Sequence, residues 1–415
     1  MSEPLFIGMA GAGTVGSGVY TLLNDNRALI AQKIGRPIVL KSIYCRHPEK
    51  VRSQLGNDCP LTTDIFSLVQ DPDIQIVVEV MGGIEPARSF ILNALEHGKH
   101  VVTANKALLA THGNEIFDKA RRCRRQVFFE AAVAGGIPII KALREGLVAN
   151  RIDRIAGIVN GTCNFILTAM QKQALSFEQA LAQAQQFGYA EADPSFDIEG
   201  IDSGHKLSIL CSLAFQKRIR FEPSHVLGIS KVSLTDVKIA EKLGYRIKLL
   251  AVCKTTASDK IEYRVEPTLL PEAHFLAQVD SVMNAVMVHG DAVGTTLYYG
   301  AGAGGKATAS AVIADIVDAS RASGSVGYCF EEAPDFLLPV DSEGPYYVRV
   351  GNTGLTAKQW QERFSQHQIE VKRLAEVEKS RIWITGPCLL GNLKALCSTL
   401  APEDHPLSIL RIENS

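Results

Sequence analysis

The chain has 415 residues, of which 46% are hydrophobic and 21% are charged, as is usual for globular proteins. At this length it is expected to form two or three domains with separate cores. Its 43 Lys and Arg residues against 44 Asp and Glu give a net charge of −1, which argues against a nucleic-acid partner because such proteins need a basic surface. The basic run at 121–125 is interpreted as a solvated helix end, with a phosphate-binding patch as the alternative, because no aromatic residue is interleaved with it.

No stretch reaches the apolar length that spans a bilayer, so the sequence argues against a membrane-spanning protein. The first residues enter a strand pattern without a charged leader and cleavage site. Nine cysteines without a C-x-x-C pair indicate free thiols in a reducing compartment and argue against a cysteine-based zinc site. These features predict a cytoplasmic protein.

Strand and helix patterns alternate along the first 130 residues. Helical spacing follows the first strand at Val15, Val19 and Leu22. A second helix is expected from Pro86, since proline is favoured at a first helical position, to a stop at Gly98. Short apolar runs predict strands at 5–10, 38–44, 74–80, 100–103 and 126–129. This alternation is typical of βαβ units and predicts a doubly wound parallel sheet.

The pattern changes from about residue 131. A capping-box pattern at Ser176 and Gln179 opens a helix that Gly188 closes. Further expected elements are a helix at about 200–215, strands at 246–253 and 261–265, and a helix after the glycine-rich stretch 300–305. Because helices and strands no longer alternate regularly, this region is predicted to be a separate α+β unit.

The tail has its own order of elements. Strands are expected at 346–350, 369–376, 381–385 and 407–412, and helices at 356–366 and 389–400. The resulting βαββαβ order is that of the ferredoxin-like fold. Trp360 and Trp383 are interpreted as core residues of this tail.

The first strand is followed directly by a glycine motif, Gly11-Ala12-Gly13-Thr14-Val15-Gly16. In a G-x-G-x-x-G motif the first glycine permits a tight turn, the second lets the backbone approach a pyrophosphate, and the third lets helix and strand pack closely. The phosphates then lie at the positive end of the helix. At this place, between a strand and a helix, the motif predicts a dinucleotide site.

The end of the second strand indicates which dinucleotide to expect. An Asp or Glu there would accept a hydrogen bond from the 2′-hydroxyl of NAD, but this strand ends in Tyr44-Cys45-Arg46-His47-Pro48. Arg46 can bind the 2′-phosphate of NADP with two hydrogen bonds. The sequence therefore favours NADP, and NAD use or a merely solvated arginine are the alternatives.

Two further runs carry reactive side chains. Thr103-Ala104-Asn105-Lys106 follows a strand whose carboxyl end would face the cofactor crevice. The block 188–206 holds five carboxylates between Glu191 and Asp202, at a spacing that does not fit an EF-hand loop. Asp202 and Lys206 are four residues apart, which is typical either of a surface ion pair or of a pocket for a small substrate with an ammonium group.

These residues resemble the homoserine dehydrogenase family over nearly the whole chain. The resemblance rests on the glycine motif, on the Thr103–Lys106 run, and on the three blocks 130–138, 160–167 and 188–206. It implies reversible NAD(P)-linked interconversion of L-homoserine and L-aspartate 4-semialdehyde, a step of threonine and methionine biosynthesis. It also implies a homo-oligomer, either a homodimer or a homotetramer.

The resemblance implies roles for individual residues. Lys206 corresponds to the proton donor and acceptor at the substrate oxygen, and Lys106 to a second lysine between substrate and cofactor. Glu191 corresponds to the ligand of the substrate ammonium, and Asp202 to a hydrogen-bonding group at the reacting end. Contacts with the cofactor are implied at Gly11, Gly13, Thr14, Val15, Gly16, Arg46, Thr103, Lys106, Gly188 and Gly302.

The family also binds a monovalent cation, sodium or potassium, through backbone carbonyls. The corresponding positions are Glu130, Val133, Gly135 and Ile137. Because backbone ligands leave no side-chain signature, a glycine-rich turn without an ion is the alternative.

Cys163 and His205 are interpreted as structural residues. A semialdehyde dehydrogenase would need a reactive cysteine with a positioned histidine, and no histidine lies near Cys163 in the sequence. Small buried cysteines are common in cores. His205 is next to Lys206 and therefore points to a different face of the helix.

The tail resembles an ACT domain, a regulatory module that binds amino acids. Such modules usually carry an Asp-x-Pro-Gly-like turn after the first strand, and the turn here, Gly351-Asn352-Thr353-Gly354-Leu355, lacks the Asp and the Pro. Control by threonine and a structural or dimerising role are therefore both open.

The predicted fold class is α/β, with a Rossmann-type sheet, an α+β domain and a ferredoxin-like tail. An NAD(P)-binding domain is expected at 1–130, completed by about 300–335. A substrate-binding, catalytic and dimerisation domain follows at 131–299, and an ACT-like domain at 345–415.

Two other functions fit parts of the pattern. A non-catalytic regulatory sensor of a dinucleotide or an amino acid would keep the fold and lose the lysines, but Lys106 and Lys206 are both present. Another NAD(P)-linked amino-acid or semialdehyde dehydrogenase is the nearest enzymatic alternative. The sequence thus predicts an enzyme with a small-molecule substrate and without a nucleic-acid or membrane partner.

Overall fold

The computed structural model describes residues 3–256, 260–322, 328–333, 336–337, 342–351, 355–377, 380–400 and 407–413. The chain divides into two compact units. The first contains residues 1–153, 205–221 and 289–333, and the second contains 154–204, 222–288 and 334–415. The border crosses helix α11 (Ile201–Phe215) between Gly204 and His205. Within the described ranges no helix is long and apolar enough to cross a lipid bilayer.

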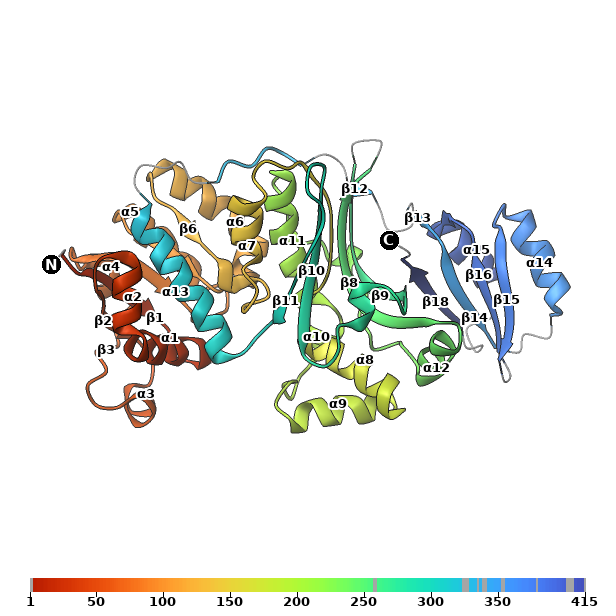
Figure 1. Ribbon diagram of the computed structural model, residues 1–415, viewed down its shortest axis with the longest axis horizontal. Helices are drawn as coiled ribbons and strands as arrows, with labels where there is room; N and C mark the ends of the chain where they lie inside the picture. Colours follow the sequence, from red (N-terminus) through yellow and green to blue (C-terminus); the bar gives the residue numbers. More distant parts are fainter. Residues whose placement is uncertain are drawn as a thin grey trace. The chain divides into compact units, whose positions relative to one another are not determined.

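The first unit is built on a six-stranded sheet in which all strands run parallel (Figure 1). The strand order is β3-β2-β1-β4-β5-β6. Strands β2 and β3 are added on one side of β1, and β4, β5 and β6 on the other, as in a Rossmann-type fold. The predicted doubly wound sheet is therefore confirmed. The strands are β1 (Leu5–Ala10), β2 (Ile38–Tyr44), β3 (Leu61–Thr62), β4 (Ile74–Glu79), β5 (His100–Thr103) and β6 (Val127–Phe128).

Helices cover both faces of this sheet because alternate residues of a strand point to opposite sides. Leu5, Ile7 and Met9 of β1 share a core with helices α1 and α13, whereas Gly8 faces Leu68 of α4. The helices are α1 (Thr14–Asp25), α2 (Arg27–Ile34), α3 (Pro48–Leu55), α4 (Ser67–Gln70), α5 (Ala87–Glu96), α6 (Lys106–Arg122), α7 (Ile139–Lys141) and α13 (Gly305–Arg321). The unit also contains strand β11 (Gly294–Ala301).

The basic run at 121–125 lies where the sequence predicts it. Helix α6 ends at Arg122, and basic residues occupy its last turn. Cations there interact favourably with the negative end of the helix dipole, so a helix-end role is sufficient to explain the run.

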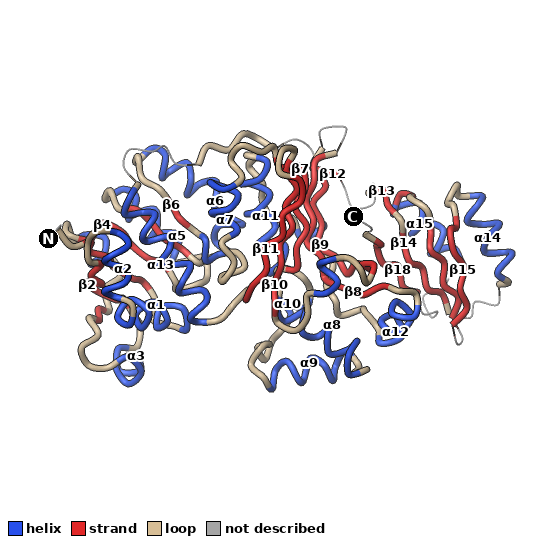
Figure 2. The backbone as a smooth tube through the Cα atoms, viewed as in Figure 1, coloured by secondary structure: helices blue, strands red, loops and turns tan. Residues whose placement is uncertain are grey.

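The second unit is built on a mixed sheet in the order β10-β7-β8-β9-β18-β14-β16-β15 (Figure 2). Strands β8 and β9 pair antiparallel along their whole length, and β9 runs parallel to β18. The capping box at Ser176 and Gln179 is confirmed at the start of α9. The elements before the tail are β7 (Ile152–Ile158), α8 (Gly161–Gln173), α9 (Phe177–Gln186), α10 (Ser195–Ile198), α12 (Leu234–Lys242), β8 (Tyr245–Thr255), β9 (Ile261–Pro271) and β10 (Met283–Gly290).

The described part of 342–413, which we call the C-terminal module, follows the predicted βαββαβ order. Its main elements are β14 (Tyr346–Val350), α14 (Ala357–Gln366), β15 (Val371–Val377), β16 (Ser380–Thr385), α15 (Leu390–Leu400) and β18 (Leu407–Ile412). Trp360 and Trp383 are each 1% exposed and their rings lie 5.2 Å apart, so their core role is confirmed. The turn that bears on the ACT resemblance falls at 352–354, outside the described residues. Short strands are β12 (Phe336–Leu337), β13 (Glu343–Gly344) and β17 (Cys388–Leu389).

Candidate active site

Two positions where β1 turns into α1, Gly11 and Gly16, have room for glycine only. Gly11 has a φ of +114°, and a Cβ atom there would lie 2.6 Å from the carbonyl oxygen of Val80. A Cβ on Gly16 would lie 2.2 Å from the carbonyl oxygen of Gly11, whereas a Cβ on Gly13 would meet no atom within 4 Å. The first N–H groups of a helix have no acceptor within the helix, so this open end of α1 is suited to bind phosphate.

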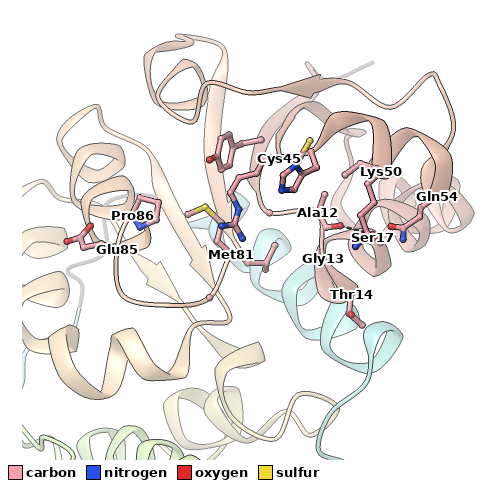
Figure 3. Close-up of a pocket in the computed structure, with 17 residues that line it drawn as sticks. Ala12, Gly13, Thr14, Ser17, Cys45, Lys50, Gln54, Met81, Glu85 and Pro86 are labelled. Atoms are coloured by element: carbon pink, nitrogen blue, oxygen red, sulfur yellow. Dashed lines mark hydrogen bonds between the residues drawn. The ribbon is translucent and has the colours of Figure 1, made fainter. Parts of the chain in front are cut away.

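A pocket of about 620 Å³ opens at this turn. Figure 3 shows Ala12, Gly13 and Thr14 on one side of it and Met81 across from them. From the end of β2 and from α3 the pocket receives three basic side chains, Arg46, His47 and Lys50. The acidic residue in its lining is Glu85, which is far along the chain from β2. The lining residues are Gly11–Thr14, Ser17, Tyr44–His47, Lys50, Val51, Gln54, Val80–Gly82, Glu85 and Pro86.

Glu79, the last residue of β4, holds the far wall of the pocket in place. Its side chain is fully buried and accepts hydrogen bonds from the backbone N–H of Met81 (2.8 Å) and from the hydroxyl of Thr103 (2.6 Å). Asn105 caps α6 by accepting from Leu108 N–H, and its amide donates to the carbonyl of Gly83. This network joins the loop after β4 to the segment that carries Lys106.

The other predicted cofactor residues of the first unit do not line this pocket. Thr103 is buried at the end of β5, Lys106 is half-buried as the first residue of α6, and Gly302 is buried in the loop before α13. Gly11, Gly13, Thr14 and Arg46 are thus brought together, and Thr103 is connected to the same pocket through Glu79. Val15 and Gly16 lie behind the turn, in the first turn of α1.

The loop after β6 contains the four positions implied for a monovalent cation. Val133 and Gly135 are buried, and no described residue donates a hydrogen bond to their carbonyl oxygens. The carbonyl of Glu130 accepts only a long bond from Val133 N–H, 3.4 Å, and that of Ile137 accepts from Ile139 N–H. Buried carbonyl oxygens without donors are suitable ligands for sodium or potassium, so the loop fits such an ion.

Two buried carboxyl groups fix this loop. The side chain of Glu130 accepts from the backbone N–H groups of Ile140 and Lys141, each at 2.8 Å. The N–H of Glu130 donates to Asp315 Oδ2 at 2.8 Å. Burial raises the pKa of both Glu130 and Asp315 above the ordinary range. No group of three His, Cys, Asp or Glu side chains in the described ranges could hold a metal ion.

In the second unit Asn160 joins two carboxylates. Its amide nitrogen donates to Asp197 Oδ1 at 2.7 Å and to Asp202 Oδ2 at 2.8 Å. Its amide oxygen accepts from Cys163 N–H and so caps helix α8. Asp202 is 3% exposed. Cys163 is buried and its thiol donates to the carbonyl of Asp197, which agrees with a structural role.

The remaining predicted residues lie in different environments. Lys206 is 9% exposed and stands one helical turn after Asp202 on α11. Its neighbour His205 packs edge-on against Phe221, with ring centroids 4.4 Å apart. Glu191 is exposed, and its backbone carbonyl accepts from Gln185. Gly188 has a φ of +73° just after α9, as expected for a glycine that ends a helix.

Four residues of these networks have no role in the sequence prediction: Lys50, Glu79, Asn160 and Asp197. Asn160 carried a local signal, because Asn before a helix is a typical N-cap. The second function of its amide, bridging two carboxylates, depends on segments about 40 residues away and has no local signature.

The glycine turn, the pocket and the parallel sheet define a dinucleotide-binding protein with a Rossmann-type domain. A family model described as the NAD-binding domain of homoserine dehydrogenase matches residues 11–130, and one described as homoserine dehydrogenase matches residues 138–317. The chain belongs to the homoserine dehydrogenase family.

Known proteins support this assignment along the chain. It is 51% identical over 360 residues to a homoserine dehydrogenase of Pseudomonas aeruginosa, which covers 84% of this chain and 82% of that protein. The crystal structure of a homoserine dehydrogenase from Thiobacillus denitrificans superposes with a TM-score of 0.94 at 44% identity, over 99% of both chains. A hyperthermophilic archaeal homoserine dehydrogenase in complex with NADPH superposes with a TM-score of 0.65 at 29% identity, over 77% of this chain and 98% of that one.

Proposed function

We propose that this chain reduces L-aspartate 4-semialdehyde reversibly to L-homoserine with NADPH as the preferred reductant. The observation that carries the proposal is the pocket at the β1–α1 turn, which Arg46, His47 and Lys50 line together, whereas the acidic residue of its lining, Glu85, comes from a distant part of the chain. Basic side chains favour a 2′-phosphate, whereas a free 2′-hydroxyl would need an acceptor. The similar archaeal enzyme in complex with NADPH supports the same choice.

The chain's own residues would handle the substrate and its proton. The nicotinamide supplies a hydride to the aldehyde carbon when it is bound. The Lys206 ammonium donates a proton to the substrate oxygen, and its charge stabilises the developing alkoxide. Asp202, held by Asn160, accepts from the hydroxyl formed there. Glu191 pairs with the substrate ammonium, and Lys106 lies between substrate and cofactor.

We also propose a bound monovalent cation, a homo-oligomer and a cytoplasmic location. A sodium or potassium ion at Glu130, Val133, Gly135 and Ile137 is supported by the buried carbonyls of Val133 and Gly135, to which no described residue donates a hydrogen bond. A homodimer or homotetramer, and the division at 1–130, 131–299 and 345–415 with an ACT-like tail, rest on the family resemblance. A cytoplasmic location rests on the nine cysteines without a C-x-x-C pair.

Replacing Lys206 tests the chemistry. Steady-state oxidation of NADPH with L-aspartate 4-semialdehyde should show kcat reduced about 10²–10⁴-fold in Lys206→Ala, since that is the usual contribution of a positioned acid. Lys238→Ala, an exposed lysine of α12, is the matched control and should keep wild-type kcat. Near-normal kcat in Lys206→Ala would refute the proton-transfer role.

Replacing the basic residues of the pocket tests the cofactor. Arg46→Ala and Lys50→Ala should each lower kcat/KM for NADPH about tenfold and leave kcat/KM for NADH nearly unchanged, because a charge-assisted hydrogen bond is lost only with the phosphate. An equal effect on both cofactors, or none, would contradict the preference for NADP.

A further inference from the structure

A second, smaller pocket lies within the second unit, where the C-terminal module meets β9. Its volume is about 50 Å³, enough for a few water molecules or one small anion. The end of β18 contributes Arg411 and the first turns of α15 contribute Lys394. His225 and Arg264 complete a lining in which Glu266 is the acidic residue.

Arg411 is fixed at this pocket by its neighbours. Its residue is 4% exposed, and its Nη1 donates to the hydroxyls of Ser342 (2.6 Å) and Tyr346 (2.8 Å). Nη2 donates to the carbonyl of Glu343, and the Tyr346 ring lies 5.4 Å below the guanidinium carbon. A Cβ on Gly344 would be 2.5 Å from that carbon, so a side chain there would displace the guanidinium. The buried Nε has no hydrogen-bond partner among the described residues.

The surrounding charges do not balance. Among the described carboxylates only Glu262 comes within 4.0 Å of Arg411, at 3.7 Å, and Glu262 also pairs with Arg264 and Lys254. The linked network holds four cations and three carboxylates: Arg154, Lys254, Arg264 and Arg411 against Glu262, Glu266 and Glu413. Arg411 thus has only a distant carboxylate that other cations share, and a buried guanidinium is costly unless an anion compensates it.

We propose that this pocket binds a small oxyanion, a carboxylate or a phosphate. Arg411 and Lys394 supply the charge, and the first turn of α15 lies beside them with its N-terminal N–H groups. The Tyr346 ring and the hydrogen bonds of Arg411 keep the guanidinium in place, and its burial strengthens its attraction for an anion. The site is separate from the dinucleotide pocket, which is built from residues of the first unit.

The anion has two sources that the structure accommodates. A neighbouring pocket of about 430 Å³ shares Leu227 and Glu266 with this one. A small amino acid could therefore place its carboxylate at Arg411, its ammonium at Glu266 and its side chain in the larger pocket. Free phosphate would use the basic end alone.

The loop that lines both pockets also contacts helix α10. Leu227 N–H donates to the carbonyl of Val265, and Ile229 N–H donates to the carbonyl of Ile198 at 2.7 Å. A Cβ on Gly228 would lie 2.2 Å from the carbonyl oxygen of Ile198, so the loop and the helix touch directly. An anion in the pocket would thus contact the loop that supports α10, where Asp197 binds Asn160.

Binding to the purified full chain tests the proposal. Phosphate, acetate and alanine are titrated against wild type at constant ionic strength in sodium chloride, with the melting midpoint as readout. At least one should raise the midpoint of wild type and of Lys358→Gln, an exposed lysine of α14 that does not line the pocket. In Lys394→Gln and Arg411→Gln the apparent Kd should be about tenfold weaker.

The variants separate the outcomes. If Arg411→Gln does not fold, the apparent Kd of Lys394→Gln alone decides whether the pocket binds the anion. No midpoint shift in wild type beyond that of chloride, or equal shifts in all variants, would overturn the proposal. Glu266→Gln identifies the source of the anion. If this variant loses alanine binding and retains acetate binding, the ligand is an amino acid. If wild type does not bind alanine and the variant binds phosphate as tightly as wild type or more tightly, the ligand is the free anion.

Discussion

The two units hold their buried carboxyl groups in different ways. In the first unit Glu79 and Asp315 accept hydrogen bonds from backbone and hydroxyl groups, and burial raises the pKa of both. A neutral donor network does not supply a full opposite charge, so it cannot offset the loss of hydration.

In the second unit two buried carboxylates, Asp236 and Glu262, face arginines. Asp236 of α12 accepts from Arg349 of β14 at 2.7 Å, and Glu262 accepts from Arg264 at 2.7 Å. Burial alone would raise the pKa of Asp236 and Glu262, but the guanidinium partners outweigh it and hold both below the ordinary range. Burial by itself therefore does not decide the charge of a carboxyl group. The cation beside it does.

The largest expected effect on stability comes from breaking a buried ion pair between a carboxylate and an arginine. Arg349→Met leaves Asp236 buried without its cation and should lower the free energy of unfolding by about 3–5 kcal/mol. Both tryptophans of the chain lie in the C-terminal module, so urea unfolding followed by their fluorescence reports on this region. The exposed pair Arg52–Glu49 is the control, and Arg52→Met should cost about 0–1 kcal/mol.

The double variant Asp236→Asn with Arg349→Met sharpens this test. Removing both charges should recover a large part of the free energy of unfolding that Arg349→Met loses. The reason is that much of this loss comes from the uncompensated charge of Asp236. Equal stability of the single and double variants would show that Arg349 acts through packing and not through its charge.

A smaller effect on stability is expected where a buried carboxyl group has only neutral hydrogen-bond donors. Glu79→Ala leaves the N–H of Met81 and the hydroxyl of Thr103 without their acceptor and should cost about 1–3 kcal/mol. Glu79→Gln keeps an acceptor for the backbone and should cost less. Thermal unfolding measured by circular dichroism, together with KM for NADPH, would check both. If Gln and Ala are equally disruptive, the charge of Glu79 matters more than its hydrogen bonds.

The smallest effects are in the pH dependence, and they have opposite signs. Glu79 has a pKa above 4.5 in the folded chain, so its contribution to stability is present below 4.5 and is lost as the pH rises through the folded value. Asp236 has a pKa below 3.8, so its contribution is present above 3.8 and is lost as the pH falls through the folded value.

Melting midpoints from about pH 4 to about pH 8 would reveal the contrast. Glu79→Gln cannot ionise, so its midpoint should improve relative to wild type as the pH rises above 4.5. Arg349→Met should behave in the opposite direction, because Asp236 then becomes a carboxyl group with neutral donors only. Its deficit should grow with pH. Parallel curves for all three proteins would contradict the distinction between the two units.

Much of the fold could be predicted because its signals are local. The alternation of apolar runs gave the parallel sheet, and the tail elements were predicted to within a few residues, as at 346–350 and 407–412. The capping box at Ser176 depends on residues three apart. Strands β7, β10 and β11 carried no comparable local signal and were not predicted.

The sequence by itself determined the glycine turn, its phosphate-binding helix end and the residues that carry the family resemblance. These features depend on backbone geometry and short-range spacing, which neighbouring residues in the chain determine. Only the tertiary structure decided that Asn160 bridges Asp197 and Asp202, that Glu79 joins two loops, and that Arg411 borders a pocket with surplus positive charge. Such partners lie tens to hundreds of residues apart in the chain. A hydrogen bond or ion pair between them exists only once the packed elements bring both groups out of water together.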